Sequence, residues 1–244
     1  MSADYSQIEF YAGEGGSVDT GDLGIVNQVD DDYAILTVAR QNGRVRAIIT
    51  VHDEPPPIDP AWDCVAELPW RSGIHPRVCG WGREGEDLPI PVPAGADLRA
   101  RYVVLDGDAG SKQHASPDRY DEEPLEHYLL QIWPAAAEPS VVAVSTAAWS
   151  QYWTFGPEAE AAVAQLDSVP DPQRLVRVID AALEAHPDVV TKLLAGDDRY
   201  RVGVIRYAQE LFRLTYASDA YSEIQHDYDE LNRLIDDRVA ARRP

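Results

Sequence analysis

Cysteine is scarce in this sequence of 244 residues, which contains only Cys64 and Cys79. A small secreted domain held together by disulfides would carry more, and neither cysteine has the spacing of a metal site. Both lie in segments that we expect to be strands, so we expect buried free thiols. No apolar stretch approaches the roughly 18 residues of a membrane span, and residues 1–5 do not resemble a signal peptide. We therefore expect a cytoplasmic protein with no membrane association.

Basic residues are also few, with 21 Lys and Arg against 42 Asp and Glu, so the formal net charge is -21. A surface this negative repels phosphate backbones and anionic lipids, which argues against direct binding of nucleic acid. The densest basic candidates, Arg40, Arg44 and Arg46, are separated by neutral residues. The charge favours a basic protein partner. A net charge this negative is equally typical of proteins from acidic proteomes, in which it only aids solubility. The sequence leaves both interpretations open.

Recognisable catalytic and cofactor motifs are absent as well. Residues 80–85 match a dinucleotide-binding pattern, but prolines follow where that motif needs the start of a helix, so we expect a strand end and a loop. Asp106 and Asp108 resemble the opening of a calcium loop, but its twelfth position is Pro117, and we expect a turn between strands instead. None of the six histidines has metal-site spacing. We expect no catalytic residue, no metal and no cofactor.

Short β-branched and aromatic runs bounded by Gly, Pro and Asp indicate strands in the first part of the chain. Residues 33–39 and 45–51 flank Asn42-Gly43, a strong signal for a hairpin between the two runs. Further strands are expected at residues 8–11, 63–68, 77–81, 98–105 and 126–133. This regular spacing predicts an antiparallel β-sandwich over residues 1–140.

Helical periodicity replaces the strand pattern later in the chain, and residues 134–140 mark the boundary. Asp171-Pro172 predicts a helix start, Pro187 begins a short helix to Leu194, and Asp197 caps the next one. The last helix is expected to start at residue 218 or 219. The fold class is therefore α+β, with an antiparallel sandwich over residues 1–140 followed by a helical domain over residues 141–244. Aromatic residues concentrated at 149–155 either join the two parts or form an exposed interaction patch.

Acidic residues gather in three loops of the strand-built part, where residues 1–140 carry 25 acidic and 10 basic side chains, a net charge of -15. Such clusters often mark only a solvated loop. If the loops converge, they form a negative face that can steer a basic protein into contact. The candidate partner-binding residues are Asp30, Asp31, Asp32, Asp106, Asp108, Asp121, Glu122 and Glu123.

The strand-built part resembles the competence-protein J type of nuclease inhibitor. The similarity is carried by the residues 70–75 (Trp-Arg-Ser-Gly-Ile-His), 91–95 (Pro-Val-Pro-Ala-Gly), 98–102 (Leu-Arg-Ala-Arg-Tyr) and 128–133 (Tyr-Leu-Leu-Gln-Ile-Trp). It covers about 130 residues and does not extend to the helical part. The resemblance implies a β-sandwich without catalysis or cofactor, whose partner is a basic nuclease.

The leading hypothesis is an inhibitory or immunity-type binding protein that neutralises a basic enzyme, most plausibly a nuclease or toxin. Its loop carboxylates would occupy the sites meant for phosphates, and opposite charge would speed association. One alternative is a scaffold that recruits partners or dimerises through its helical domain. A second is a metal-assisted hydrolase that uses scattered Asp and His residues.

Overall fold

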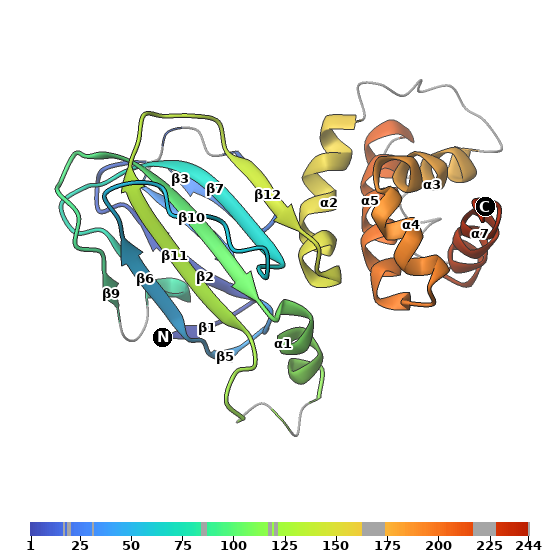
Figure 1. The fold of residues 1–244 in the computed structure, drawn as a ribbon, viewed down its shortest axis with the longest axis horizontal. Helices are drawn as coiled ribbons and strands as arrows, with labels where there is room; N and C mark the ends of the chain where they lie inside the picture. The colour runs from blue at the N-terminus through green and yellow to red at the C-terminus, as the bar shows by residue number, and fades with distance from the viewer. Residues whose placement is uncertain are drawn as a thin grey trace. The chain divides into compact units, whose positions relative to one another are not determined.

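A computed structural model describes residues 1–16, 18, 21–30, 32–83, 87–116, 119, 122–162, 174–216 and 228–243. The chain divides into two compact units, residues 1–150 and residues 151–244 (Figure 1). The first contains two five-stranded sheets, and most of the helices belong to the second, so the expected order of strands followed by helices is confirmed. The expected boundary lay at residue 140. The strand β12 (Val141–Ser145) pairs with the first unit, and the division falls ten residues later.

The first sheet is antiparallel throughout, with the strand order β3-β4-β2-β8-β9. Its strands are β2 (Gln7–Tyr11), β3 (Val26–Asp30), β4 (Tyr33–Thr37), β8 (Arg77–Gly80) and β9 (Leu88–Pro89). A short separate ribbon pairs β1 (Ser2–Ala3) with β5 (Gly43–Arg44).

The second sheet has the strand order β12-β7-β10-β11-β6. Its other strands are β6 (Ala47–Val51), β7 (Cys64–Arg71), β10 (Asp97–Leu105) and β11 (His127–Pro134). The expectation of purely antiparallel pairing is wrong at one edge, because β6 runs parallel to β11. A parallel pair needs a long connection, and here 75 residues separate the end of β6 from the start of β11.

Residues from the two sheets contact one another in the core of the first unit. Phe10 in β2 meets Trp70 in β7 with ring centroids 4.3 Å apart. The hydroxyl of Tyr102 in β10 donates to the carbonyl of Thr37 in β4 at 2.8 Å. Burial of these large side chains contributes to the favourable free energy of folding, and the tyrosine hydroxyl keeps its hydrogen bond inside the core.

On the opposite face of the second sheet, Arg99 and Arg101 share the carboxylate of Glu67. Their Nε atoms donate to its two oxygens at 2.9 and 2.8 Å, and both arginines are buried. Arg101 also donates to the carbonyl of Pro56, and Arg99 to that of Pro139. The two guanidinium groups thus bind the loops on either side of the sheet, which explains charged residues in an otherwise apolar strand.

Two local expectations are wrong. β4 and β6 do not form a hairpin around Asn42-Gly43, because they lie in different sheets, and the chain between them crosses from one sheet to the other. The expected turn at Asp106-Gly107-Asp108 is instead the start of a helix, α1 (Gly107–His114). Gly107 and Gly110 are poor helix formers, so local propensity gave no sign of this helix.

The second unit is helical. It contains most of α2 (Ala148–Ala162), in which the division between the units falls, and then α3 (Arg174–Ala185), α4 (Pro187–Leu194), the short 3-10 turn η4 (Asp198–Tyr200), α5 (Arg201–Tyr216) and α7 (Tyr228–Ala240). α4 has the bounds expected from the sequence, and the Asp197 carboxylate accepts from the Arg199 N–H as a cap. Asp171, Ser218 and Asp219 lie outside the described residues.

Ion pairs and an apolar seam hold the helices together. Arg238 in α7 and Arg242, just beyond its end, both bind the carboxylate of Asp180 in α3, at 2.7 and 2.9 Å. Leu231 and Ile235, which lie four residues apart in α7, are buried. In α2, Trp149 and Phe155 are buried and Tyr152 is 38% exposed. None of the helices seen among the described residues has the length and apolar character to cross a membrane.

Candidate functional site

The helix α1 connects the end of β10 with the loop that leads to β11, and two of the three acidic loops lie at its ends. Asp106 immediately precedes the helix and has a left-handed backbone conformation (φ 58°). Gly107 is the first residue of the helix. A Cβ on Gly107 would lie 2.8 Å from Trp149, and one on Gly110 would clash with Glu126. The two glycines are therefore required because α1 packs closely against these side chains.

Three carboxyl groups meet at the start of α1. Asp63 immediately precedes β7, whose first residue, Cys64, lies opposite Val104 near the end of β10, so Asp63 comes close to Asp106. Burial, and then the charges of Asp108 and Asp106, together raise the pKa of Asp63 to about 6. The Oδ1 atom of Asp63 is buried and has no hydrogen-bond partner among the described residues. The three groups therefore concentrate negative charge at this position.

The backbone around this cluster is held by the same residues. The Oδ1 atom of Asp108 accepts from the N–H of Trp149 at 2.7 Å, at the start of α2. The carbonyl of Asp63 accepts from the N–H of Thr146 at 2.8 Å. The exposed carboxylate of Asp106 has no such structural hydrogen bond at the helix start. Of the two aspartates flanking Gly107, Asp106 is therefore the one available for contact with a partner.

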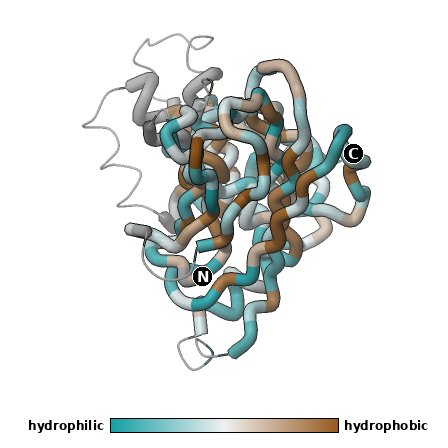
Figure 2. Tube along the Cα trace, turned by 90° about the vertical axis from the view of Figure 1, so that its left-hand side faces the viewer, coloured by the Kyte–Doolittle hydropathy of each residue, from teal (hydrophilic) through white to brown (hydrophobic). Residues whose placement is uncertain are grey.

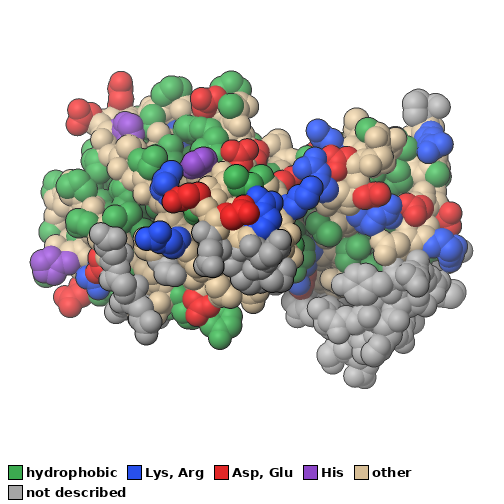
Figure 3. Space-filling model, turned by 90° about the horizontal axis from the view of Figure 1, so that it is seen from below, with side chains coloured by type: hydrophobic (Ala, Val, Ile, Leu, Met, Phe, Trp, Pro, Cys, Tyr) green, Lys and Arg blue, Asp and Glu red, His purple; other side chains and the backbone are tan. Residues whose placement is uncertain are grey.

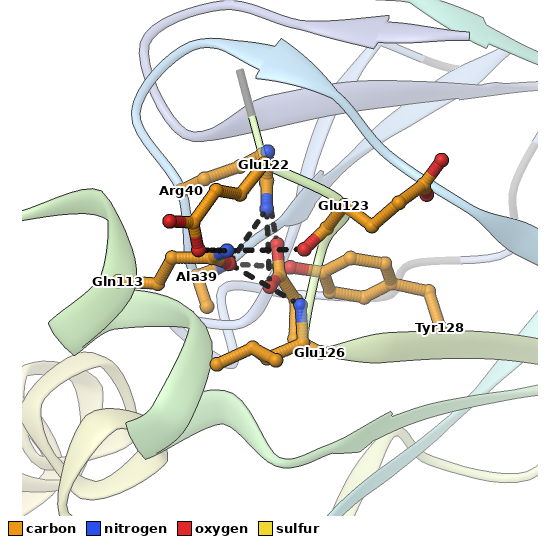
Figure 4. A network of polar contacts seen from close by, with 8 residues as sticks. Ala39, Arg40, Gln113, Glu122, Glu123, Glu126 and Tyr128 are labelled. Atoms are coloured by element: carbon orange, nitrogen blue, oxygen red, sulfur yellow. Dashed lines mark hydrogen bonds and ion pairs between the residues drawn. The ribbon is translucent and has the colours of Figure 1, made fainter. Parts of the chain in front are cut away.

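A buried polar network fixes the other end of α1 (Figure 4). Nε of Arg40 donates to Glu126 at 2.6 Å, and both side chains are almost fully buried. Gln113 from α1 accepts from Arg40 at 3.4 Å. The hydroxyl of Tyr128 accepts from the N–H of Ala39 at 2.8 Å. These contacts tie the crossing segment, α1 and the start of β11 together, and the buried charges of Arg40 and Glu126 are paired with each other.

The loop before β11 carries Glu122 and Glu123, and Gln113 holds it against α1. Its Nε2 atom donates to the carbonyl of Glu123 at 3.0 Å and to the carboxylate of Glu122 at 3.3 Å. Hydrogen bonds from Arg119 and then Gln113 lower the pKa of Glu122. The Glu123 side chain is 79% exposed and meets Arg46, which is 62% exposed, at 3.3 Å. An exposed pair of this kind contributes little, so Glu123 is accessible to a partner.

The first acidic loop lies elsewhere. Asp32 directly precedes β4, whereas Arg40 follows the far end of that strand, so β4 alone separates them by about 15 Å. The structure thus brings Asp106, Asp108, Glu122 and Glu123 to the two ends of one helix and does not bring Asp32 to them. Asp30 ends β3, but its side chain is not described; Asp31 and Asp121 lie outside the described residues.

Acidic side chains do not form a uniform face. Figure 3 shows one side of the molecule, on which acidic residues in red lie beside basic residues in blue. The cluster of Asp63, Asp106 and Asp108 is distinctive because burial and the charges of its two neighbours raise the pKa of Asp63. Within the described part of the chain, no group of three or more His, Cys, Asp and Glu residues has the arrangement of a metal site.

Reasoning from the sequence missed Asp63, Arg40, Gln113 and Glu126. Their partners are distant in the chain: Arg40 and Glu126 are 86 residues apart, and Gln113 lies on a helix that was not expected. Charged residues within apolar runs are the one signal that could have identified Arg40 and Glu126, since such residues rarely stay buried without a partner. Both cysteines are buried free thiols, as expected.

Comparison of the chain with protein-family models, with curated proteins and with solved structures found no match.

Proposed function

We propose that this chain is an acidic binding protein that neutralises a basic partner enzyme through the surface around α1. The observation that carries the proposal is the cluster of Asp63, Asp106 and Asp108, where burial and mutual repulsion keep the pKa of Asp63 at about 6. Carboxylates held this close attract a basic surface, because a cationic partner relieves their repulsion. A nuclease is the class of basic enzyme that the resemblance to nuclease inhibitors implies.

Rigid support of the binding surface favours this proposal. Arg40, Glu126 and Gln113 fix both the helix and the loop of Glu122 and Glu123 before any partner arrives. A preorganised surface loses little conformational entropy on binding, which improves affinity. The contacts of Phe10 with Trp70 and of Tyr102 with Thr37 also support the finer proposal that the two sheets pack face to face as a β-sandwich, the scaffold expected for such loops.

Inhibition would follow from competition for the phosphate-binding site. The exposed carboxylates of Asp106 and Glu123 lie at the two ends of α1, a helix of eight residues and hence about 12 Å long. Successive phosphates of one strand are spaced about 3.4 Å along the axis of duplex DNA, so the two ends of the helix can reach cationic sites for phosphates that are not adjacent. Opposite charge would speed association, and salt would weaken it.

The test is capture of partner proteins from the native host on the immobilised chain at low and at high salt, followed by mass spectrometry. A double variant, Asp106→Asn with Glu123→Gln, removes two charges from the surface around α1. Asparagine tolerates the left-handed conformation of residue 106, so the fold should persist. The matched control, Glu138→Gln with Glu184→Gln, removes the same charge from exposed positions elsewhere.

We expect a basic nuclease that the wild-type chain and the control retain at low salt and that the surface variant releases. Purified partner then allows a direct assay of nuclease inhibition with the same three chains. Capture of no basic protein, or capture that is indifferent to both salt and the surface variant, would refute the proposal.

A further inference from the structure

The strand β6 forms one edge of the second sheet, and its outer side is open. In a strand, the N–H and C=O of one residue point to the same side, and neighbouring residues alternate. The Arg46 carbonyl accepts from Tyr128, and the His52 N–H donates to Ile132, so even-numbered residues face β11. Ala47, Ile49 and Val51 therefore direct their backbone groups away from the sheet, where the described residues provide no further strand.

The other three sheet edges carry features that discourage pairing with another chain. β12 and β3 each contain an irregularity in register, between Val142 and Val144 and between Gln28 and Asp30. β9 has only two residues, one of which is Pro89. Bulges, proline and short length are the devices by which soluble proteins protect exposed edges.

β6 has none of these protections. Its pairing with β11 is regular, and its sequence Ala-Ile-Ile-Thr-Val contains neither a charge nor a proline. Ile48 is 54% exposed and Val51 is 43% exposed. Figure 2 views the chain from the side on which β6 lies in Figure 1 and shows apolar stretches in brown on that side. An edge that is regular, apolar and open is a template for strand addition.

The charged residues on either side of β6 indicate which strand would pair with its open edge. Arg44 and Arg46 precede it, and Asp53 and Glu54 follow it, and all four side chains are exposed. A second β6 that runs antiparallel, with Ile49 opposite Ile49, brings Asp53 and Glu54 of each copy toward Arg44 and Arg46 of the other. Opposite charges at the two ends of such a strand pair stabilise it, whereas a parallel arrangement would place like charges together.

The neighbourhood leaves room for this arrangement. The ribbon strand β1 occupies the outer side only as far as Val45, whose N–H donates to the Met1 carbonyl at 3.1 Å. Beyond it, a hollow of about 330 Å³ is lined by residues that include Arg44, Arg46, Ala47 and Glu123. Asp53 and Glu54 of a second copy would approach the two arginines of this hollow, where the chain bends away from the strand direction.

We propose that two copies of this chain associate through antiparallel pairing of their β6 edges, which joins their second sheets into one continuous sheet. Ala47, Ile49 and Val51 of each copy would exchange backbone hydrogen bonds, and Ile48 of one copy would pack against Thr50 of the other. The proposal does not rest on the proposed function, although Glu123 of the surface around α1 also lines the hollow beside β6. The contact is small, so the dimer should dissociate readily on dilution.

The test is sedimentation velocity on the full chain from about 1 to about 200 µM, a range that suits a small interface. We expect a reversible monomer–dimer equilibrium. Ile48→Lys should abolish the dimer, because each copy adds a charge to the other's edge. Val141→Lys is the matched control: it charges an exposed apolar residue of the opposite edge, β12, and should leave the dimer unchanged. Equal melting temperatures would show that both variants fold.

Charge exchange tests the register. Arg44→Glu and Glu54→Arg should each weaken the dimer about tenfold or more, since each variant brings like charges close together at both ends of the symmetric pair. The double variant, Arg44→Glu with Glu54→Arg, should restore the dimer. A chain that stays monomeric over the whole range, a dimer that survives Ile48→Lys, or a double variant that fails to regain what the single variants lose would each overturn the proposal.

Discussion

Arg40 and Glu126 form a 2.6 Å ion pair in which the two side chains are 4% and 0% exposed, although 86 residues separate them in the sequence. Arg40 lies on the segment that crosses from β4 to β6, and Glu126 lies directly before β11. The pair thus ties the crossing between the two sheets to the strand that borders β6. Gln113 extends it to α1, so the same contact supports the surface proposed to bind a partner.

Removal of one member of this pair should be strongly destabilising. Arg40→Met leaves the Glu126 carboxylate buried without its cation, which costs about 3–5 kcal/mol of unfolding free energy. Denaturant unfolding at pH 7 measures the loss. The control is Arg46→Met, which removes an arginine from the exposed pair with Glu123 and should cost less than about 1 kcal/mol. Equal effects of the two substitutions would show that burial of the Arg40 pair has no special role.

Asp63 should make the fold less stable as the pH rises. Its folded pKa of about 6 lies above the ordinary value of 3.8, so the folded state binds the proton more tightly between these values. Stability contributed by the protonated group is present below pH 4 and is lost as the pH rises through about 6. Asp63→Asn should remove this loss and raise the unfolding free energy at pH 8 by about 1 kcal/mol, after allowance for solvent screening.

The measurement for Asp63 is the melting temperature of the wild type and of Asp63→Asn from pH 4 to pH 8. The two curves should lie closest together at pH 4, diverge as the pH rises to about 6, and stay apart up to pH 8, with the variant more stable. Curves that run parallel over the whole range would contradict the assigned role of Asp63.

Glu67 should show the opposite dependence. Burial alone would raise its pKa, but hydrogen bonds from Arg99 and Arg101 outweigh burial and lower it below the ordinary 4.5. The stability that Glu67 contributes is therefore complete above pH 4.5 and is lost as the pH falls through its folded pKa. Glu67→Gln leaves two buried arginines without a carboxylate and should cost about 3 kcal/mol at pH 7. Chemical denaturation at pH 7 and pH 3 checks both statements, since the difference between wild type and variant should shrink at the lower pH.

Both thiols should be inert in the folded protein. Burial and then the carboxylates of Glu9 and Asp87 raise the pKa of Cys79 to about 11, and burial raises that of Cys64 still further. The reactive thiolate is therefore scarce at pH 8. Mass spectrometry after treatment with iodoacetamide should find little alkylation in buffer and complete alkylation of both residues in denaturant. Rapid modification of the native chain would show that the cysteines are accessible.

Short sequence signals predicted the parts of the fold that depend on interactions between residues close together in the chain. Pro187 favours the first turn of a helix, Gly196 with its positive φ ends one, and α4 lies between them with the expected bounds. The carboxylate of Asp197 caps the following turn as expected. Strands with clear alternation, such as β10, also appear where the pattern placed them.

Long-range contacts determine the rest. The Asn42-Gly43 signal is local, but Arg40 is held by Glu126 and β6 pairs with β11, so the predicted hairpin gives way to a crossing. α1 forms despite its glycines because they allow close packing against Trp149 and Glu126. The acidic loops were recognised from the sequence, but their positions depend on β4 and α1, which separate Asp32 from Glu123. No pattern along the chain shows which loops meet.

The most direct test of the central claim is the association rate of the captured basic partner with three chains: the wild type, Asp106→Asn with Glu123→Gln, and the control Glu138→Gln with Glu184→Gln. Stopped-flow measurements at several salt concentrations give the rate and its salt dependence. Charge steering through the surface around α1 predicts a slower rate and a weaker salt dependence for the first double variant alone. Equal rates for the two double variants at every salt concentration would contradict it.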